Sequence, residues 1–185
     1  MIVQVKTNQQ IEKFNQIWME SWKEKGFEIE VSESYLSQFL FKKGDEFVAT
    51  IEFKSIENSS IIDLLPLGSL GEELQFNINR TIEVDKLSIQ KDSRKKGLLS
   101  LILSFLIDFA INNNVTYYVG LLEPNLYAAL KNYFEFPLVR LSKDLWYKGD
   151  YVVPIKLDIT DMTNNIFKYN WYRSTIDHLD GKTSG

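Results

Sequence analysis

A predicted strand, a short basic turn and a long apolar helix follow one another between residues 81 and 114, and this unit constrains the fold of the whole chain. The strand is expected at 82–90, the turn at 91–97 and the helix from about 98 to 111. Three asparagines at 112–114 end the helix, because asparagine leaves helices readily. A strand followed directly by a helix packed on it is typical of a sheet covered by helices.

The turn carries Arg94, Lys95 and Lys96, followed by Gly97. A helix that begins directly after them presents unpaired backbone N–H groups and the positive end of its dipole. A glycine also lets a ligand approach the backbone closely. These features predict a site for a phosphate or pyrophosphate. A solvated basic turn, in which Gly97 only forms a tight corner, explains the same residues and stays open, because short glycine motifs often match by chance.

The apolar residues of the strand change face part-way along it. Ile82 and Val84 lie on one face of a regular strand, whereas Leu87 and Ile89 lie on the other. A β-bulge near residues 85–86 would restore the register and splay the strand. The alternative is a strand buried on both faces, where the parity of apolar residues carries no information.

The helix is apolar except for Ser100, Ser104 and Asp108, whose spacing of four places them on one narrow polar stripe. This pattern favours a helix packed against a sheet. A membrane span is not expected, because the run is shorter than the ~20 apolar residues a bilayer requires and contains Asp108.

The composition bounds the classes of function. The 185 residues carry a net charge of −4, which argues against general nucleic-acid binding. The chain has no cysteine and a single histidine, His178, so thiol nucleophiles, disulfides and a histidine metal cluster are not expected. We expect one domain over residues 1–185 with a loose tail at 180–185, and a cytoplasmic protein without a signal peptide.

The remaining elements alternate between strands and helices, which predicts an α/β fold with a mixed sheet and helices packed on it. They are a strand at 2–6, a helix at 9–25 capped by Asn8, a hairpin of 38–41 and 47–54, an apolar loop at 58–71, a strand at 115–122, a helix from a cap at Asn125 to 134, strands at 138–141 and 145–157, and a last helix from Thr160 or Asp161 to 176.

The turn, read as R-x-x-G-x between a strand and an apolar helix, resembles motif A of the GNAT acyltransferases. The usual pattern is Q/R-x-x-G-x-G/A, and here Leu99 replaces the last small residue. The resemblance implies a GNAT-like fold, in which two central parallel strands splay apart and the acyl donor occupies the gap. It also implies acetyl-CoA or acyl-CoA as co-substrate, bound by its pyrophosphate at the turn, and no metal.

The second half of the chain looks like autoinducer synthases and N-acyl amino acid synthases, a branch that takes long acyl groups, often from acyl carrier protein. This branch also carries a Glu-x-x-Arg, matched here by Glu83 with Lys86 in place of arginine. The positions that carry the resemblance are Glu123, Pro124, Asn125, Leu126, Tyr127, Leu130, Tyr133, Phe134, Tyr147, Gly149 and Pro154.

The resemblance implies direct acyl transfer from a thioester to a small-molecule amine. Glu83 is the expected base, with Asp85 as the alternate, and Tyr133 is the expected acid, with Tyr127 second. Glu123 is either a second acceptor-site carboxylate or a solvating residue at the end of the strand. Ion-paired carboxylates and core aromatics explain these same residues without catalysis. The cofactor-binding residues it implies are Leu87, Ser88, Ile89, Arg94, Lys95, Lys96, Gly97 and Leu98.

Two other functions remain open from the sequence. One is a GNAT-like module that binds acyl-CoA or a protein partner without turnover. The other is a structural domain with no anion site, for which charge reversal at Arg94 and Lys96 would change only solubility.

Overall fold

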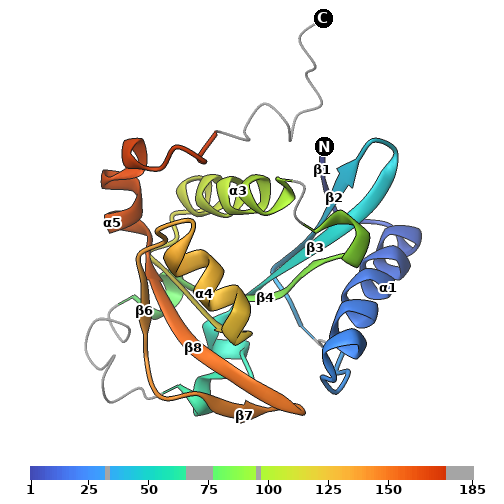
Figure 1. Cartoon of the computed structure of the whole chain (residues 1–185), viewed down its shortest axis with the longest axis horizontal. Helices are drawn as coiled ribbons and strands as arrows, with labels where there is room; N and C mark the ends of the chain where they lie inside the picture. Colours follow the sequence, from blue (N-terminus) through green and yellow to red (C-terminus); the bar gives the residue numbers. More distant parts are fainter. Residues whose placement is uncertain (32–33, 66–76, 95–96, 174–185) are drawn as a thin grey trace, which may run out of the picture.

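A mixed sheet of eight strands forms the centre of the computed structural model, which describes residues 1–31, 34–65, 77–94 and 97–173. The strand order is β1-β2-β3-β4-β5-β8-β6, and β7 pairs with β8. The strands are β1 Ile2–Gln4, β2 Ser37–Lys43, β3 Glu46–Ser55, β4 Thr81–Ile89, β5 Tyr117–Leu122, β6 Leu138–Arg140, β7 Leu145–Tyr147 and β8 Asp150–Asp158. The helices are α1 Asn8–Lys25, α3 Leu98–Asn112, α4 Pro124–Asn132 and α5 Ile159–Asn164, and the short 3-10 turns include η1 Ile56–Asn58 and η2 Ile62–Leu64. The mixed α/β fold expected from the sequence is confirmed (Figure 1).

The helices cover opposite faces of the sheet. On β2, Phe39 and Phe41 pack with Phe105 of α3, whereas Leu40 between them packs with Trp18 of α1. Successive side chains of a strand point to opposite faces, so α3 and α1 lie on different sides. The α3 side contains an aromatic core in which the rings of Phe53 and Phe109 stack at 4.0 Å.

The two central parallel strands separate part-way along their length. β4 pairs with β5 only from Thr81 to Glu83, opposite Tyr117 to Val119, although β4 continues to Ile89. The splayed parallel strands expected from the resemblance are therefore present. A Cβ on Gly120, the next residue of β5, would lie 3.0 Å from the carbonyl oxygen of Val84, so glycine permits the close approach of the strands at this point.

The predicted bulge in β4 is confirmed. Thr50 of β3 lies opposite Ser88, but Glu52 lies opposite Asp85, so one residue of β3 faces two residues of β4. Lys86 within the bulge has φ +46°. The Thr50 hydroxyl donates a hydrogen bond of 2.7 Å to the Lys86 carbonyl oxygen, which satisfies a backbone group that the bulge displaces.

The polar stripe on α3 is buried under the segment that follows α5. The Tyr172 hydroxyl donates a 2.7 Å hydrogen bond to Asp108 Oδ1, and the Arg173 backbone N–H donates to Ser104 Oγ at 3.1 Å. Both Asp108 and Ser104 are buried. The stripe therefore holds the chain after α5 against the helix.

Several predicted element ends were wrong by a few residues. α1 is capped by Thr7 in a capping box rather than by Asn8, and α4 by Glu123 rather than Asn125, because Pro124 occupies the first helical turn. The last helix begins after a cap at Asp158 and ends at Asn164, far short of residue 176. The expected tail at 180–185 lies outside the described residues, as does much of the loop at 58–71.

No helix in the described part of the chain is both long enough and apolar enough to cross a membrane.

Candidate active site

A cavity of about 580 Å³ lies where β4 and β5 separate. Figure 1 shows β4 running between α1 on one side and α4 on the other, and all three elements line the cavity together with β5 and the start of α3. Its walls are largely apolar, with carboxylates and lysines among them. The volume falls within the ~300–1,000 Å³ of small-molecule sites. The apolar lining includes Trp22, Phe27, Leu87, Leu99, Leu121, Leu122, Leu126 and Phe134.

Glu83 lines the cavity and is the last residue of β4 that pairs with β5. It is only 3% exposed, and its Oε2 has no hydrogen-bond partner among the described residues. Burial and the negative charge of Asp85 raise the pKa of Glu83 to about 7, while Lys54 and the Ser59 side chain oppose the rise. A carboxyl group that titrates near neutral pH can accept and return a proton.

A buried charge network lies beside Glu83 on β3 and β4. Lys54 Nζ is 2.6 Å from Asp85 Oδ2 and 3.5 Å from Glu52 Oε1. Lys86 Nζ is 2.7 Å from the same Glu52 oxygen and lies 4.9 Å from the centre of the Trp18 ring. Gln38 Nε2 donates to Glu52 Oε2 at 2.5 Å. The second predicted carboxylate, Asp85, is therefore at the cavity but ion-paired.

The predicted phosphate turn leads into an uncapped helix. Gly97 is the N-cap of α3 with φ +75°, and no side chain caps the helix. Gly97 and Leu98 line the cavity, as do Leu87, Ser88 and Ile89 of β4. The first N–H groups of α3 have no partner within the helix and suit an anion. Lys95 and Lys96 lie outside the described residues.

Arg94 also lines the cavity, but its guanidinium group is engaged. Its Nη1 and Nη2 donate to the two carboxylate oxygens of Glu24 at 3.0 and 2.8 Å, and Nε donates to the Ile89 carbonyl oxygen at 2.9 Å. The positive charge of Arg94 is thus balanced by Glu24 of α1. This pair could not be predicted from local sequence, because the two residues are 70 positions apart.

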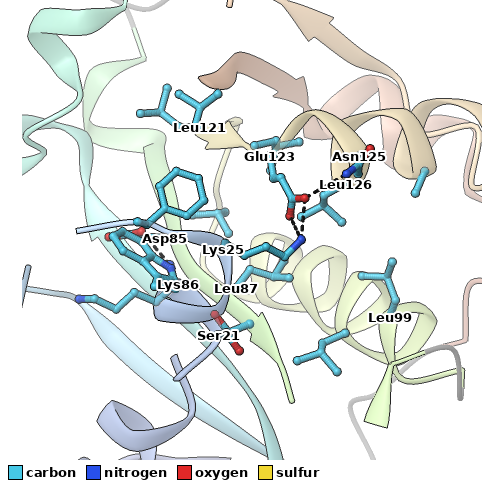
Figure 2. A pocket seen from close by; sticks show the side chains of 18 of the residues that line it. Ser21, Lys25, Asp85, Lys86, Leu87, Leu99, Leu121, Glu123, Asn125 and Leu126 are labelled. Carbon is cyan, nitrogen blue, oxygen red and sulfur yellow. Dashed lines mark hydrogen bonds and ion pairs between the residues drawn. The ribbon is translucent and has the colours of Figure 1, made fainter. Parts of the chain in front are cut away.

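An ion pair spans the cavity between α1 and the start of α4. Lys25 Nζ lies 2.5 Å from Glu123 Oε2, and Asn125 Nδ2 donates to Glu123 Oε1 at 3.2 Å. Figure 2 shows the Lys25 and Glu123 side chains pointing toward one another, with Leu87 and Leu126 nearby. Glu123 was a candidate from the sequence, whereas Lys25 was not, since only its spatial neighbours distinguish it from other surface lysines.

The structure does not bring Tyr133 to the cavity. This residue is 86% exposed at the C-cap of α4, and its ring lies beside Phe134. Tyr127 is half-buried and packs against the core. The tyrosine that lines the cavity is Tyr147 of β7. Tyr147 is one of the positions that carry the resemblance, but the resemblance implies no role for its side chain.

No group of metal-ligating side chains occurs among residues 1–31, 34–65, 77–94 and 97–173.

Solved structures share this fold, although no protein-family model matches the sequence and no curated protein is significantly similar to it. FeeM, an N-acyl amino acid synthase from uncultured soil microbes, superposes with a TM-score of 0.69 at 12% identity, covering 89% of this chain and 93% of FeeM. BjaI, a CoA-dependent acyl-homoserine lactone synthase, gives 0.64 at 12% identity, covering 90% and 86%. The ribosomal-protein-S18-alanine N-acetyltransferase from Escherichia coli gives 0.56 at 13% identity, covering 86% and 93%.

These similarities concern the fold. The chain has the fold of N-acyltransferases and acyl-homoserine lactone synthases, as the resemblance to GNAT proteins implied.

Proposed function

We propose that the protein is an N-acyltransferase that moves an acetyl or longer acyl group from a CoA or acyl carrier protein thioester to the amine of a small molecule. The observation that carries the proposal is the Glu83 carboxyl group. It is buried at the point where the parallel strands part, it titrates near neutral pH, and one of its oxygens has no partner among the described residues.

The reaction forms one C–N bond and breaks one C–S bond. The neutral amine attacks the thioester carbonyl carbon, and the thiolate leaves. Glu83 takes the proton that the ammonium form of the acceptor must lose, directly or through a water, and passes it to solvent. The second proton, which the nitrogen loses as the amide forms, goes to the departing thiolate. Holding both reactants in one cavity supplies much of the rate acceleration, because their relative motion is already restricted.

The donor is best accommodated along β4 and the start of α3. The pyrophosphate would contact the free N–H groups after Gly97, with Leu98 contributing only its backbone and Lys95 and Lys96 their charge. The pantetheine arm would follow Leu87, Ser88 and Ile89 into the gap between the strands. The apolar walls of the cavity suit an acyl chain, and BjaI, which shares the fold, is CoA-dependent.

The charges around the cavity favour a cationic acceptor at Glu83. Asp85 and Glu52 are paired with Lys54 and Lys86, and Glu123 is paired with Lys25. Glu83 has no ion-pair partner within the described residues, so the ammonium group of an acceptor would find its counter-ion there.

The test is release of free CoA thiol from acetyl-, hexanoyl- and dodecanoyl-CoA in the presence of a panel of amines, and of amino acids in particular. The chain contains no cysteine, so a thiol reagent reports only on CoA. Glu83→Gln is expected to lower turnover at least about 100-fold, the usual contribution of a general base. The exposed Glu57 provides the control variant Glu57→Gln, which should retain wild-type turnover.

Donor binding is measured separately by thermal stabilisation. A ligand specific for the folded state adds ~2.7 kcal/mol of stability at a hundredfold excess over its dissociation constant. Glu83→Gln should keep this stabilisation while losing turnover. Turnover that is unchanged in Glu83→Gln would contradict the proposed role of this residue.

The alternative is a module that binds an acyl thioester or a protein partner without turnover. The specific observations in its favour are Leu99 in place of a small residue and the engagement of Arg94 by Glu24. It predicts stabilisation by acyl-CoA with no thiol release for any amine or donor length, acyl carrier protein thioesters included.

A further inference from the structure

Four charged side chains form a square on one face of strands β3 and β4. Lys54 lies directly opposite Glu83, and Glu52 lies directly opposite Asp85. Residues that face one another across antiparallel strands have Cβ atoms about 4.5–5.5 Å apart, closer than diagonal neighbours. Lys54 would therefore be expected to pair with Glu83.

Lys54 instead forms an ion pair with Asp85, its diagonal neighbour. Its Nζ lies 2.6 Å from Asp85 Oδ2, and no ion pair joins it to Glu83 in the part of the chain that the structure describes. Glu52 does not replace Asp85 in this role, because its oxygens already accept from Lys86 and Gln38 and its contact with Lys54 is longer, at 3.5 Å. Asp85 is therefore the nearer of the two carboxylates that form ion pairs with the Lys54 ammonium among the described residues.

We infer that Asp85 is a positioning residue: its carboxylate holds the Lys54 ammonium away from Glu83, which leaves Glu83 unpaired and able to take a proton from the acceptor amine. This inference rests on the proposed function. It differs from the expectation that Asp85 is itself an alternate base. In this role Asp85 takes no proton from the acceptor and acts on Glu83 only by holding the Lys54 ammonium.

The environment of Glu83 supports this role. The polar groups that face it are Asp85 on its own strand, Glu52 and Lys54 on β3, and Ser59 after η1, while β5 places the apolar Val119 opposite it. Apart from burial, Asp85 is the largest influence that raises the pKa of Glu83, and Lys54 is the largest that lowers it. Lys54 itself is desolvated, yet the nearby carboxylates raise its pKa.

The test is a titration of Glu83 by NMR in protein labelled at the glutamate side-chain carboxyl carbons, with the signal assigned from its loss in Glu83→Gln. In Asp85→Asn, Lys54 should turn to Glu83 and move its titration midpoint down by about 1 pH unit or more. The acid limb of the kcat/KM profile should move with it, and turnover at pH 8 should fall about tenfold because a paired carboxylate is a weaker base.

Two further variants separate this role from a structural one. Asp85→Glu keeps the charge and should restore the titration midpoint and most of the turnover. Adding Lys54→Met to Asp85→Asn removes the competing ammonium, so the double variant should be more active than Asp85→Asn alone. If Asp85 only stabilises the fold, adding Lys54→Met should instead lower the turnover of Asp85→Asn further.

The outcomes also separate this inference from the proposed function. A wild-type protein with no turnover for any donor and amine refutes the proposed function, but the NMR titration still reports whether Lys54 moves to Glu83. Loss of the Asp85 charge by itself lowers the Glu83 midpoint, so a Lys54 that moves is recognised by a larger downward shift on Asp85→Asn in the wild-type background than in a Lys54→Met background. An unchanged Glu83 midpoint in Asp85→Asn, or no recovery of turnover in the double variant, overturns the positioning role even if the wild type is an active enzyme.

Discussion

Replacing Glu83 with glutamine is expected to stabilise the protein above neutral pH and to leave its stability unchanged in acid. The folded-state pKa of this carboxyl group is about 7, compared with an ordinary value of 4.5, because burial disfavours the charged form. Between these two values the folded protein holds a proton that the unfolded chain has lost. Stability therefore falls as pH rises through this range.

The size of the effect follows from the interval between the two pKa values. Each pH unit corresponds to 1.36 kcal/mol, so the cost of ionising Glu83 in the folded state reaches about 3 kcal/mol above pH 7. Glutamine does not titrate and has a shape similar to the protonated acid. For a chain of this length, about 3 kcal/mol corresponds to roughly 6–12 °C in the melting temperature.

The assay is thermal unfolding followed by circular dichroism at intervals from pH 4 to pH 8.5, with the wild type, Glu83→Gln and the control Glu57→Gln side by side. Only the difference between variants is used, since other carboxyl groups change the stability of all three proteins. We expect the Glu83→Gln difference to be near zero at pH 4 and to grow until about pH 8. A difference that is constant across this range would refute the assigned pKa and its cause.

Three further substitutions test features of the fold. Gly97→Ala places a side chain at φ +75°, which should cost about 1–2 kcal/mol in urea unfolding and weaken CoA binding measured by calorimetry; unchanged affinity would contradict a donor site at this turn. Gly120→Ala brings a Cβ within 3.0 Å of the Val84 carbonyl oxygen and should cost about 1–3 kcal/mol in the same assay, whereas a neutral effect would mean that the strands can part further. Tyr172→Phe removes the hydrogen bond to Asp108 and should cost about 1–2 kcal/mol in urea without loss of turnover, because both residues lie away from the cavity.

Local patterns in the sequence predicted the central unit of the fold well. The change of face between Val84 and Leu87 located the bulge. One extra residue in the strand returns the apolar side chains after it to the same buried face as those before it. Gly97 before an apolar run located the start of α3. These features depend on neighbours in the chain, which a sequence displays directly.

The parts that the sequence did not predict depend on distant contacts. Which elements pack together decides that Arg94 pairs with Glu24. It also decides that Lys54 pairs with Asp85 and not with Glu83. The end of the last helix at Asn164 was missed because the apolar residues beyond it, including Trp171, pack on the core from a short 3-10 helix and irregular segments that do not continue the α-helix. The placement of Tyr133 on the surface likewise depends on where α4 ends.

The walls of the cavity come from residues as far apart in the chain as Ser21 in α1 and Val152 in β8. Contacts of such long sequence separation form late in folding, because closing long loops costs chain entropy before any contact rewards it. The cavity can therefore exist only once most of the described chain has assembled. A bound donor would therefore report the completed tertiary structure, because a chain in which only β1, β2 and β3 are paired would not bind it.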